Sequence, residues 1–488
     1  MLGEVNDSGK PNIDPLAAKR IREKLGLPET VVSSLDSNGN EILHEEQLDD
    51  FQRLLKTTTE NEFIRVASTI DLKSTDSQGM TIGHHAARLG YAKAYMDYRN
   101  NYPNPKKERH IEPSSFEDHR GNTPLDLAVL NDHLDVVKEI LNAGKGWVKF
   151  NVFYWLKNEP PKIETLKTIL KSPVSKDYES LFRKALNWAA STEGNNDFID
   201  WLFDNWPNIS RPDYSCSDRE IPDDRKHPLN AAIQAKNNSA VEKLFARGLG
   251  NDNFGVKRPI EVAISSFNDE GLRTLIQRKM INTNVSPLYL AFTANNYQGF
   301  RILVEEAGCD INSIHVFSNV GGYLNKAIRD GNEFWVEFLI GLKANPHNPN
   351  ESGTTPLGTL CSTLVNDYKR HNFIKMFAKA GVDISGPAYI DKKTGGELTV
   401  AKKLVDVDDI QGLVLLKELG VDLNKLDFRR ENPLHTAVRS KKFHAFKKLI
   451  ELGVDLNVKN KEGDTPLDLI KNISEYDAYR DYLRSLVG

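Results

Sequence analysis

The sequence contains little of what marks the more specialised classes of protein. Its 488 residues include three cysteines, none in a Cys-x-x-Cys pair, so we expect neither a disulfide framework nor a cysteine zinc site. No stretch approaches 18 uninterrupted apolar residues, and the polar first 14 residues contain no apolar core of a cleaved leader. We therefore expect a protein of a reducing compartment, the cytoplasm, with no membrane span.

The sequence also lacks a strong excess of charge. The formal net charge is −4, with 27% charged and 39% hydrophobic residues. A nucleic-acid-binding chain usually has a basic domain or stripe, and no large one is visible here. The apolar content is sufficient for a large core, but the length exceeds what one compact core usually contains. We therefore expect either about three globular domains or one array of repeats, and no nucleic-acid partner.

One pattern recurs near the C-terminal end of the sequence. Residues 432–437 read Asn-Pro-Leu-His-Thr-Ala, and residues 464–469 read Asp-Thr-Pro-Leu-Asp-Leu. Pro433 and Pro466 are 33 positions apart, and so are Gly420 and Gly453. A capping residue before proline is typical of the first turn of a helix, and glycine is typical of the residue after its last turn. The spacing therefore predicts a two-helix unit that repeats every 33 residues.

Weaker copies of the same pattern fill most of the chain. We count about eleven units from residue 76 to the C-terminus, and the spacing stretches to about 40 in several places, as expected for loops inserted on one face. Apart from the two C-terminal copies, the units begin near residues 76, 118, 186, 227, 258, 286, 323, 353 and 398.

With Pro-Leu-His-x-Ala at residues 433–437, the sequence resembles the ankyrin-repeat family over residues 76–488. The resemblance implies an all-α solenoid of paired antiparallel helices joined by β-turns or hairpins. It also implies a monomer that binds a partner protein through a concave face, without a cofactor, rather than an enzyme. The irregular spacing is similar to that of ankyrin-containing effectors of intracellular bacterial pathogens, which implies a host protein as partner and the host cytoplasm as location.

Four segments follow from this interpretation. Residues 1–75 form a helical cap with a possible degenerate repeat, 76–144 form repeats, 145–226 form divergent aromatic-rich repeats, and 227–488 form repeats to the C-terminus. Long loops are expected at 99–117 and 205–226, where proline-marked and polar stretches interrupt the pattern.

The expected partner-binding residues lie at turn tips and in the aromatic-rich segment. Turn tips set partner choice in such arrays, and tryptophan is common among interface anchors. The residues expected to contact the partner are His119, Arg120, Trp147, Trp155, Phe428, Arg429 and Arg430. The last tip is locally basic, because it is followed by Arg439, Lys441, Lys442, Lys447 and Lys448. An acidic partner surface would be attracted there.

Two alternatives concern the N-terminal segment, and we favour neither. Asp36, Asn38 and Asn40 fit the first ligand positions of an EF-hand loop, but Glu41 replaces the required glycine and Gln47 the bidentate glutamate. Residues 27–36 resemble the opening of an F-box only superficially.

A degenerate first repeat or cap fits this segment better. Residues 36–44 contain aspartate, glycine, leucine and histidine at the places where a repeat has them. Terminal repeats are expected to be atypical and polar.

The sequence offers one candidate for catalysis. No phosphate-binding loop, zinc-protease or nucleophile-elbow motif is present, and we expect no metal. Cys216 lies in the loop at 205–226, with Asp218 and His227 nearby, so a cysteine-dependent, protease-like hydrolase is the alternative function. His84 and His435 occupy the histidine position of the repeat, where the ring is expected to bond within and between turns.

Overall fold

A computed structural model describes the fold of this chain. It describes residues 49–102, 113–143, 162–172, 178–206, 227–250, 258–283, 285–314, 316–317, 320–471 and 476–487. The chain divides into two compact units, residues 1–185 and 186–488, which are described separately. The expected division into four segments stays a prediction, because it rests on how closely each segment follows the repeat pattern, and the two compact units do not test that.

The described elements are pairs of helices in which the second runs back along the first. We call the first helix of each pair the inner helix and the second the outer helix. In unit 1 the pairs are α2 (Asp50–Leu55) with α3 (Glu60–Ala67), α4 (Ile82–Leu89) with α5 (Ala92–Asn101), and α6 (Pro124–Leu130) with α7 (Leu134–Ala143). A short 3-10 helix η2 (Pro113–Ser115) precedes α6, and α9 (Ile163–Lys171) contacts α7. Helix α10 (Tyr178–Ser191) spans the division between the units.

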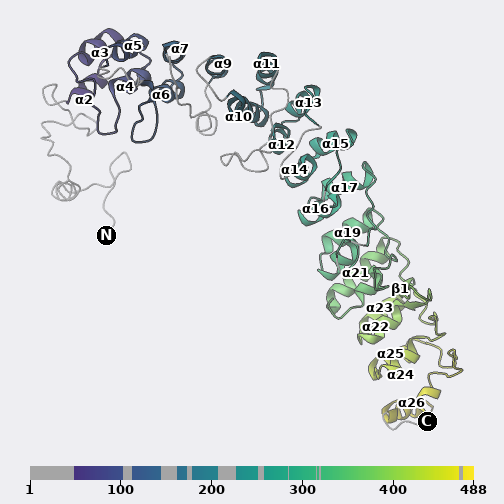
Figure 1. Ribbon diagram of the computed structural model, residues 1–488. Coiled ribbons are helices and arrows are strands. Elements are labelled where there is room, and N and C mark those ends of the chain that lie inside the picture. The colour runs from purple at the N-terminus through teal and green to yellow at the C-terminus, as the bar shows by residue number, and fades with distance from the viewer. Residues whose placement is uncertain are drawn as a thin grey trace, which may run out of the picture. The chain divides into compact units, whose positions relative to one another are not determined.

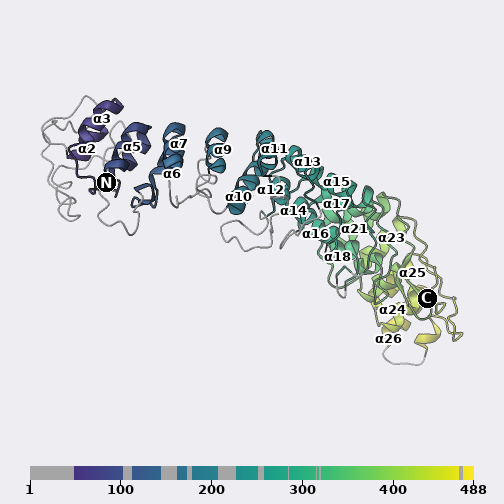
Figure 2. The same ribbon diagram turned by 45° about the horizontal axis from the view of Figure 1, so that its top comes forward.

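Unit 2 continues this arrangement. After α11 (Asn196–Asn205) its pairs are α12 (Pro228–Gln234) with α13 (Asn238–Ala246), α14 (Pro259–Ser265) with α15 (Asp269–Gln277), α16 (Pro287–Thr293) with α17 (Tyr297–Glu305), α18 (Tyr323–Arg329) with α19 (Glu333–Gly341), α20 (Pro356–Leu360) with α21 (Asp367–Lys379), α22 (Val400–Asp406) with α23 (Ile410–Glu418), and α24 (Pro433–Arg439) with α25 (Phe443–Glu451). The chain ends with η4 (Asp468–Ile470) and α26 (Asp477–Val487). Inner helices α12, α14 and α16 lie side by side, and so do outer helices α13, α15 and α17 (Figures 1 and 2).

Local signals explain where the inner helices begin. The Thr123 side chain accepts a hydrogen bond from the Asp126 N–H (3.2 Å), and Pro124 follows at the first helical position. Asn432 and Pro433 repeat this arrangement at α24. A capping oxygen satisfies an otherwise unpaired N–H, and proline has no N–H to leave unpaired. The helix starts expected from the sequence are therefore confirmed for these units.

The core lies between the inner and outer helices. Residues 433–438 of α24 are all buried, whereas α25 buries one face with Ala445, Phe446 and Leu449. The inner helices pack against neighbours on both sides and against their own outer helix, so nearly every position is covered. An all-α ankyrin solenoid, the fold class expected from the sequence, is what the described residues form.

Asparagines connect three successive repeats of unit 2 to the repeat before each of them. The Asn237, Asn268 and Asn296 amides donate to the carbonyl oxygens of Ala190 (3.1 Å), Ile233 (2.9 Å) and Ile264 (2.8 Å). Each amide oxygen also accepts the N–H three residues ahead, at the first turn of its own outer helix. One buried side chain therefore caps a helix and holds the adjacent repeat.

An inserted hairpin explains one long spacing between units. Strands β1 (Pro387–Ile390) and β2 (Glu397–Thr399) pair antiparallel, with Tyr389 opposite Leu398. The hairpin lies between α20 and α22 and contacts both. The sequence predicted stretched spacing but not this pairing.

Several expectations for irregular regions need correction or fall outside the described residues. The loop expected at 99–117 begins later, because α5 continues to Asn101. The helix expected after Pro466 is a 3-10 turn, η4. The helix pair α2 and α3 lies within the helical cap expected at residues 1–75, although the sequence interpretation placed no individual helices at these positions. The EF-hand and F-box alternatives, and the degenerate repeat at 36–44, concern residues outside those described.

Candidate partner-binding surface

Each well-formed turn between repeats is held by one side chain at its start. The Asp118 carboxylate accepts the N–H groups of Arg120 (2.8 Å) and Asn122 (2.8 Å). The Asp427 carboxylate likewise accepts those of Arg429 (2.8 Å) and Glu431 (2.9 Å). The residues between these points therefore form tips of fixed geometry.

Two predicted residues, His119 and Arg120, lie at such a tip in unit 1. Both are exposed. The His119 N–H donates to the Gln78 carbonyl of the preceding tip (2.8 Å). Its ring lies so close to Gly79 that a Cβ there would come within 2.6 Å of the ring. His119 therefore contacts the neighbouring tip, whereas the predicted Trp147 and Trp155 lie outside the described residues.

Three predicted residues lie at a tip of unit 2. Arg429 and Arg430 are exposed and Phe428 is half-buried. The Arg429 guanidinium lies over the Phe428 ring, 5.2 Å from its centroid. That ring packs on Gly396 of the hairpin, where a Cβ would come within 2.7 Å of it. The phenylalanine is therefore anchored to the preceding tip and holds the arginine beside it.

The tip at 428–430 is the middle one of three that lie side by side. The Phe428 N–H donates to the Glu397 carbonyl of the hairpin (3.2 Å), and the Lys461 N–H donates to the Arg429 carbonyl (3.0 Å). All three tips carry exposed cationic side chains. We call these residues the basic ridge: Lys392, Lys393, Arg429, Arg430, Lys459 and Lys461. The sequence identified only Arg429 and Arg430, because it does not show which tips are neighbours.

A buried ionic cluster lies beneath the ridge. The Lys402 ammonium, on a side chain 7% exposed, pairs with Asp427 and, at 3.2 Å, with Glu431. Arg439 also pairs with Glu431 (2.9 Å). Burial alone would raise the pKa of Glu431, but Lys402 and Arg439 together lower it below its usual value. Arg439, which was expected to add to the basic surface, is therefore engaged in this cluster, and its side chain remains 45% exposed.

The predicted histidines have structural partners. The His84 ring contacts the Thr81 hydroxyl (2.9 Å) and the Asn122 carbonyl of the next repeat (3.1 Å). His435 makes the same pair of contacts with Asn432 (2.8 Å) and with the Asp464 carbonyl (3.1 Å). Burial lowers the pKa of both rings. These contacts are the bonds within and between turns that the sequence predicted.

The proposed catalytic set is only partly visible. Cys216 and Asp218 lie outside the described residues. His227 is buried, and its Nδ1 accepts the Leu229 N–H (3.1 Å) at the start of α12. Burial raises the pKa of Cys309, and that of Cys361 to about 12. The hydrolase alternative therefore stays a prediction about residues outside those described.

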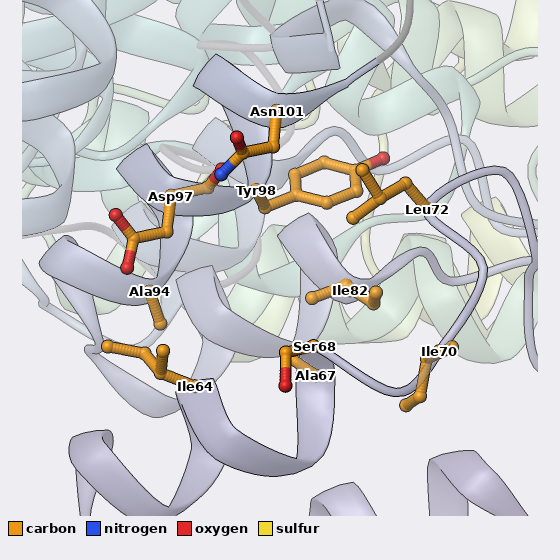
Figure 3. A pocket seen from close by; sticks show the side chains of 10 residues that line it. All are labelled: Ile64, Ala67, Ser68, Ile70, Leu72, Ile82, Ala94, Asp97, Tyr98 and Asn101. Atoms are coloured by element: carbon orange, nitrogen blue, oxygen red, sulfur yellow. The ribbon is translucent and has the colours of Figure 1, made fainter.

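Unit 1 contains a cavity of about 400 Å³ between α3, α4 and α5. Figure 3 shows the side chains around it: Ile64, Ala67, Ser68, Ile70, Leu72, Ile82, Ala94, Asp97, Tyr98 and Asn101. Most of this lining is apolar, and it brings no nucleophile and base together. Within the described ranges no group of three or more metal-binding side chains occurs, and no helix there is long and apolar enough to cross a membrane. The turn tips therefore remain the better candidate.

Comparisons with known proteins agree with this architecture. The family model for many copies of ankyrin repeats matches residues 415–470, and that for a single ankyrin repeat matches residues 120–149. A curated relative is the human transient receptor potential cation channel subfamily A member 1, which is 24% identical over 166 residues. The match covers 29% of this chain and 15% of the channel's length.

A solved structure also matches part of this chain. The ankyrin repeat domain of Bcl-3, a member of the IkappaB protein family, is 20% identical, with a TM-score of 0.36. The match covers 46% of this chain and 99% of that domain. The two family-model matches fall on helix pairs α6–α7 and α24–α25, whose arrangement recurs through the described residues. The described residues therefore form a solenoid of ankyrin-type repeats, which the family models match at residues 120–149 and 415–470.

Proposed function

We propose that this chain is a protein-interaction scaffold whose basic ridge binds an acidic segment of a partner protein. Ankyrin repeats are in general protein-interaction modules, and the ridge gives this one a recognisable chemistry. The observation that carries the proposal is the line of six exposed cations on three adjacent tips. An extended acidic segment lying across the tips would meet cations at each of them.

The local charge supports this partner. On the same tips the six cations of the ridge are accompanied by four acidic residues, Asp391, Glu397, Glu462 and Asp464, so the tips have a net charge of about +2. The cluster beneath them contains two cations and two carboxylates, so its charges cancel. The ridge is thus a positive region on a chain whose formal net charge is −4. Such complementarity speeds association and selects the sign of the partner.

The other predicted contacts extend the same proposal. The tip with His119 and Arg120 belongs to unit 1. Trp147 and Trp155 belong to the segment at 145–226 where the sequence predicts divergent aromatic-rich repeats. We propose that these residues make further contacts with the partner, together with the concave face. Tryptophan and arginine are enriched among the residues that contribute most binding energy.

The test uses an acidic peptide and two matched double variants. Arg429→Glu/Arg430→Glu reverses two charges on the ridge, and Lys375→Glu/Lys417→Glu reverses two exposed charges on outer helices α21 and α23. We expect a fluorescein-labelled Glu-Ser repeat peptide to bind the full chain at low salt, measured by fluorescence anisotropy. Reversing two exposed contacts worth about 0.2–1 kcal/mol each should weaken binding by about tenfold in the ridge variant only.

Equal weakening by both double variants would mean that the peptide responds to net charge and not to the ridge. A ridge variant that binds as tightly as the unmodified chain would remove the proposal. Raising the salt concentration from 50 to 300 mM should abolish most of the difference between the variants, because exposed charges are screened.

We propose further that the partner is a host protein and that the chain acts in host cytoplasm as a translocated bacterial effector. The support is the irregular spacing of the repeats, including the hairpin at 387–399 that separates α20 from α22. A reporter fused to the full chain and expressed in an intracellular bacterium tests this: reporter activity inside infected cells is expected, and its restriction to the bacterium would contradict it.

A further inference from the structure

Three large apolar side chains of unit 2, close to the turns between inner and outer helices, are about two-thirds exposed. Phe334 is 67% exposed, Leu364 64% and Tyr368 73%. Phe334 and Tyr368 are the second residues of the neighbouring outer helices α19 and α21, and Leu364 lies in the connection before α21. These turns follow the C-terminal ends of inner helices, whereas the ridge tips precede their N-terminal ends. We call Glu333, Phe334, Leu364, Asp367 and Tyr368 the aromatic edge.

The fold does not require aromatic residues at these positions. Among other outer helices of unit 2, the second residue is polar in every case that follows: Ser239, Glu270, Gln298, Gln411 and His444. A side chain that is two-thirds exposed contributes little to the core, and it presents apolar surface to water. Neighbouring exposed apolar groups on a folded surface usually mark an interaction site.

One of the two rings is held in place by an aromatic cluster. The Phe334 ring centroid lies 5.2 Å from that of Tyr297, which lies 4.4 Å from that of Trp335. The Trp335 Nε1 donates to the Asn295 side chain (2.9 Å), and Trp335 is almost fully buried. A ring fixed in this way loses little entropy on binding, which favours its use as an anchor.

Each aromatic residue directly follows a carboxylate. Glu333 precedes Phe334, and Asp367 precedes Tyr368. The buried Arg370 guanidinium pairs with Asp367 (2.7 Å) and with Asp409 (2.8 Å), and the His371 ring also contacts Asp409 (2.9 Å). The Lys369 ammonium donates to the Gly331 carbonyl (2.9 Å), so the carboxylates of Glu333 and Asp367 offer acceptor oxygens beside the rings without making the whole edge acidic. Cations bind favourably over aromatic faces and beside carboxylates. Each acid–aromatic pair can therefore receive a lysine or arginine side chain, with Leu364 offering apolar contact.

The spacing of the two pairs selects the conformation of the ligand. Neighbouring packed helices lie about 8–10 Å apart. In a polyproline II segment, residues three apart lie on one face and about 9 Å apart, because the rise is about 3.1 Å per residue. We propose that the aromatic edge binds a basic, proline-rich segment of a partner protein, with a lysine or arginine at every third position. This site is separate from the basic ridge and does not depend on it.

The experiment measures binding of a fluorescein-labelled Arg-Pro-Pro repeat peptide to the full chain by fluorescence anisotropy. Phe334→Ser/Tyr368→Ser places in both helices a polar residue, serine, that α13 already has at this position. We expect this double variant to lose about tenfold in affinity, from two lost cation–aromatic contacts. The control Phe267→Ser removes another exposed ring, 49% exposed, from the turn before α15, and should bind as the unmodified chain does.

Two further probes define what would overturn the proposal. A peptide with arginine at every fourth position should bind at least about threefold more weakly than the Arg-Pro-Pro peptide, because its cations do not share one face. Equal binding of both peptides, or equal binding to the double variant, would refute the assigned ligand. Binding of phosphatidylcholine vesicles that is lost in the double variant would assign the edge to a membrane instead. A dimer in sedimentation that dissociates in the double variant would assign it to a second copy of the chain.

Discussion

The buried lysine beneath the basic ridge gives the most direct test of the structure. Lys402→Met removes the ammonium and leaves Asp427 and Glu431 buried, with side chains 0% and 3% exposed. Breaking a buried ion pair by removing one partner costs about 3–5 kcal/mol. We expect the lower end, about 3 kcal/mol, because Arg439 still pairs with Glu431 and two backbone N–H groups still bind Asp427.

The adjacent lysine provides a matched control. Lys403 is 34% exposed and pairs with Asp406 at 3.6 Å on the surface. Such exposed pairs contribute about 0.2–1 kcal/mol, so Lys403→Met should have little effect. Both substitutions replace a lysine of α22 with methionine. They differ only in how deeply the lysine is buried and in which carboxylates it pairs with.

Hydrogen exchange followed by mass spectrometry is the appropriate assay. A long repeat array opens locally, so a single free energy of unfolding does not describe it. A loss of about 3 kcal/mol should speed exchange in α24 and the turn at 427–431 by about a hundredfold, since 1.36 kcal/mol corresponds to a factor of ten. If Lys402→Met changes exchange there no more than Lys403→Met does, the buried cluster does not stabilise these repeats and the reasoning fails.

Three other perturbations have defined outcomes. Gly299→Ala should destabilise the α17 repeat by about 1–3 kcal/mol, because the new Cβ would meet the Asn296 amide at 2.7 Å. Gly341→Ala should not destabilise α19, because a Cβ there would meet nothing within 4 Å, and hydrogen exchange in the two helices compares the variants. Burial lowers the pKa of His85 to about 4, whereas the pKa of an unfolded histidine is about 6.5. The buried neutral ring therefore contributes fully to stability above pH 6.5, and this contribution declines as the pH falls toward 4. An NMR titration that finds the ring charged at pH 6 would contradict this. Cys361, buried with a pKa of about 12, should resist iodoacetamide at pH 8 in the folded chain, as peptide mapping can check.

The repeat and its helix starts could be predicted from the sequence because their signals are local. A capping residue followed by proline, as at Thr123 and Pro124, needs only a few neighbouring residues to act. The same holds for His435, whose ring forms hydrogen bonds with Asn432, three positions earlier, and with the Asp464 carbonyl in the next turn. Once the period is known, these contacts follow from it.

The ionic cluster could not be predicted in the same way. Lys402 reads as a solvated lysine, because its partner Asp427 is 25 positions away in the next turn. The available signal is positional: Lys402 is the third residue of its inner helix, which is the slot of His435 in the following repeat and is buried. A lysine in that slot requires a carboxylate, and a search for one would have reached Asp427.

The sequence could not give the full extent of either surface, because each surface is made by residues of different repeats that are neighbours only in the folded chain. The sequence joined Arg429 and Arg430 to the cations that follow them along the chain, Arg439, Lys441, Lys442, Lys447 and Lys448. Hydrogen bonds between tips instead connect the tip at 428–430 to Lys461 and to the hairpin. Phe334 and Tyr368 gave no signal, because an apolar residue in the first turn of an amphipathic helix is usually part of its buried face.

Both surfaces use positions that the fold leaves unspecified. In most described repeats of unit 2, the core fixes the inner helix and a capping asparagine or aspartate fixes the outer helix, and a residue such as Asp427 at the start of the turn fixes the tip. Tip residues such as Arg430 and second residues of outer helices such as Phe334 carry none of these duties. Each repeat contacts only its neighbours, so a substitution at such a position changes the surface without propagating through the array. The scaffold can therefore have a basic surface at one end of its repeats and an aromatic surface at the other, each free to change with its own partner.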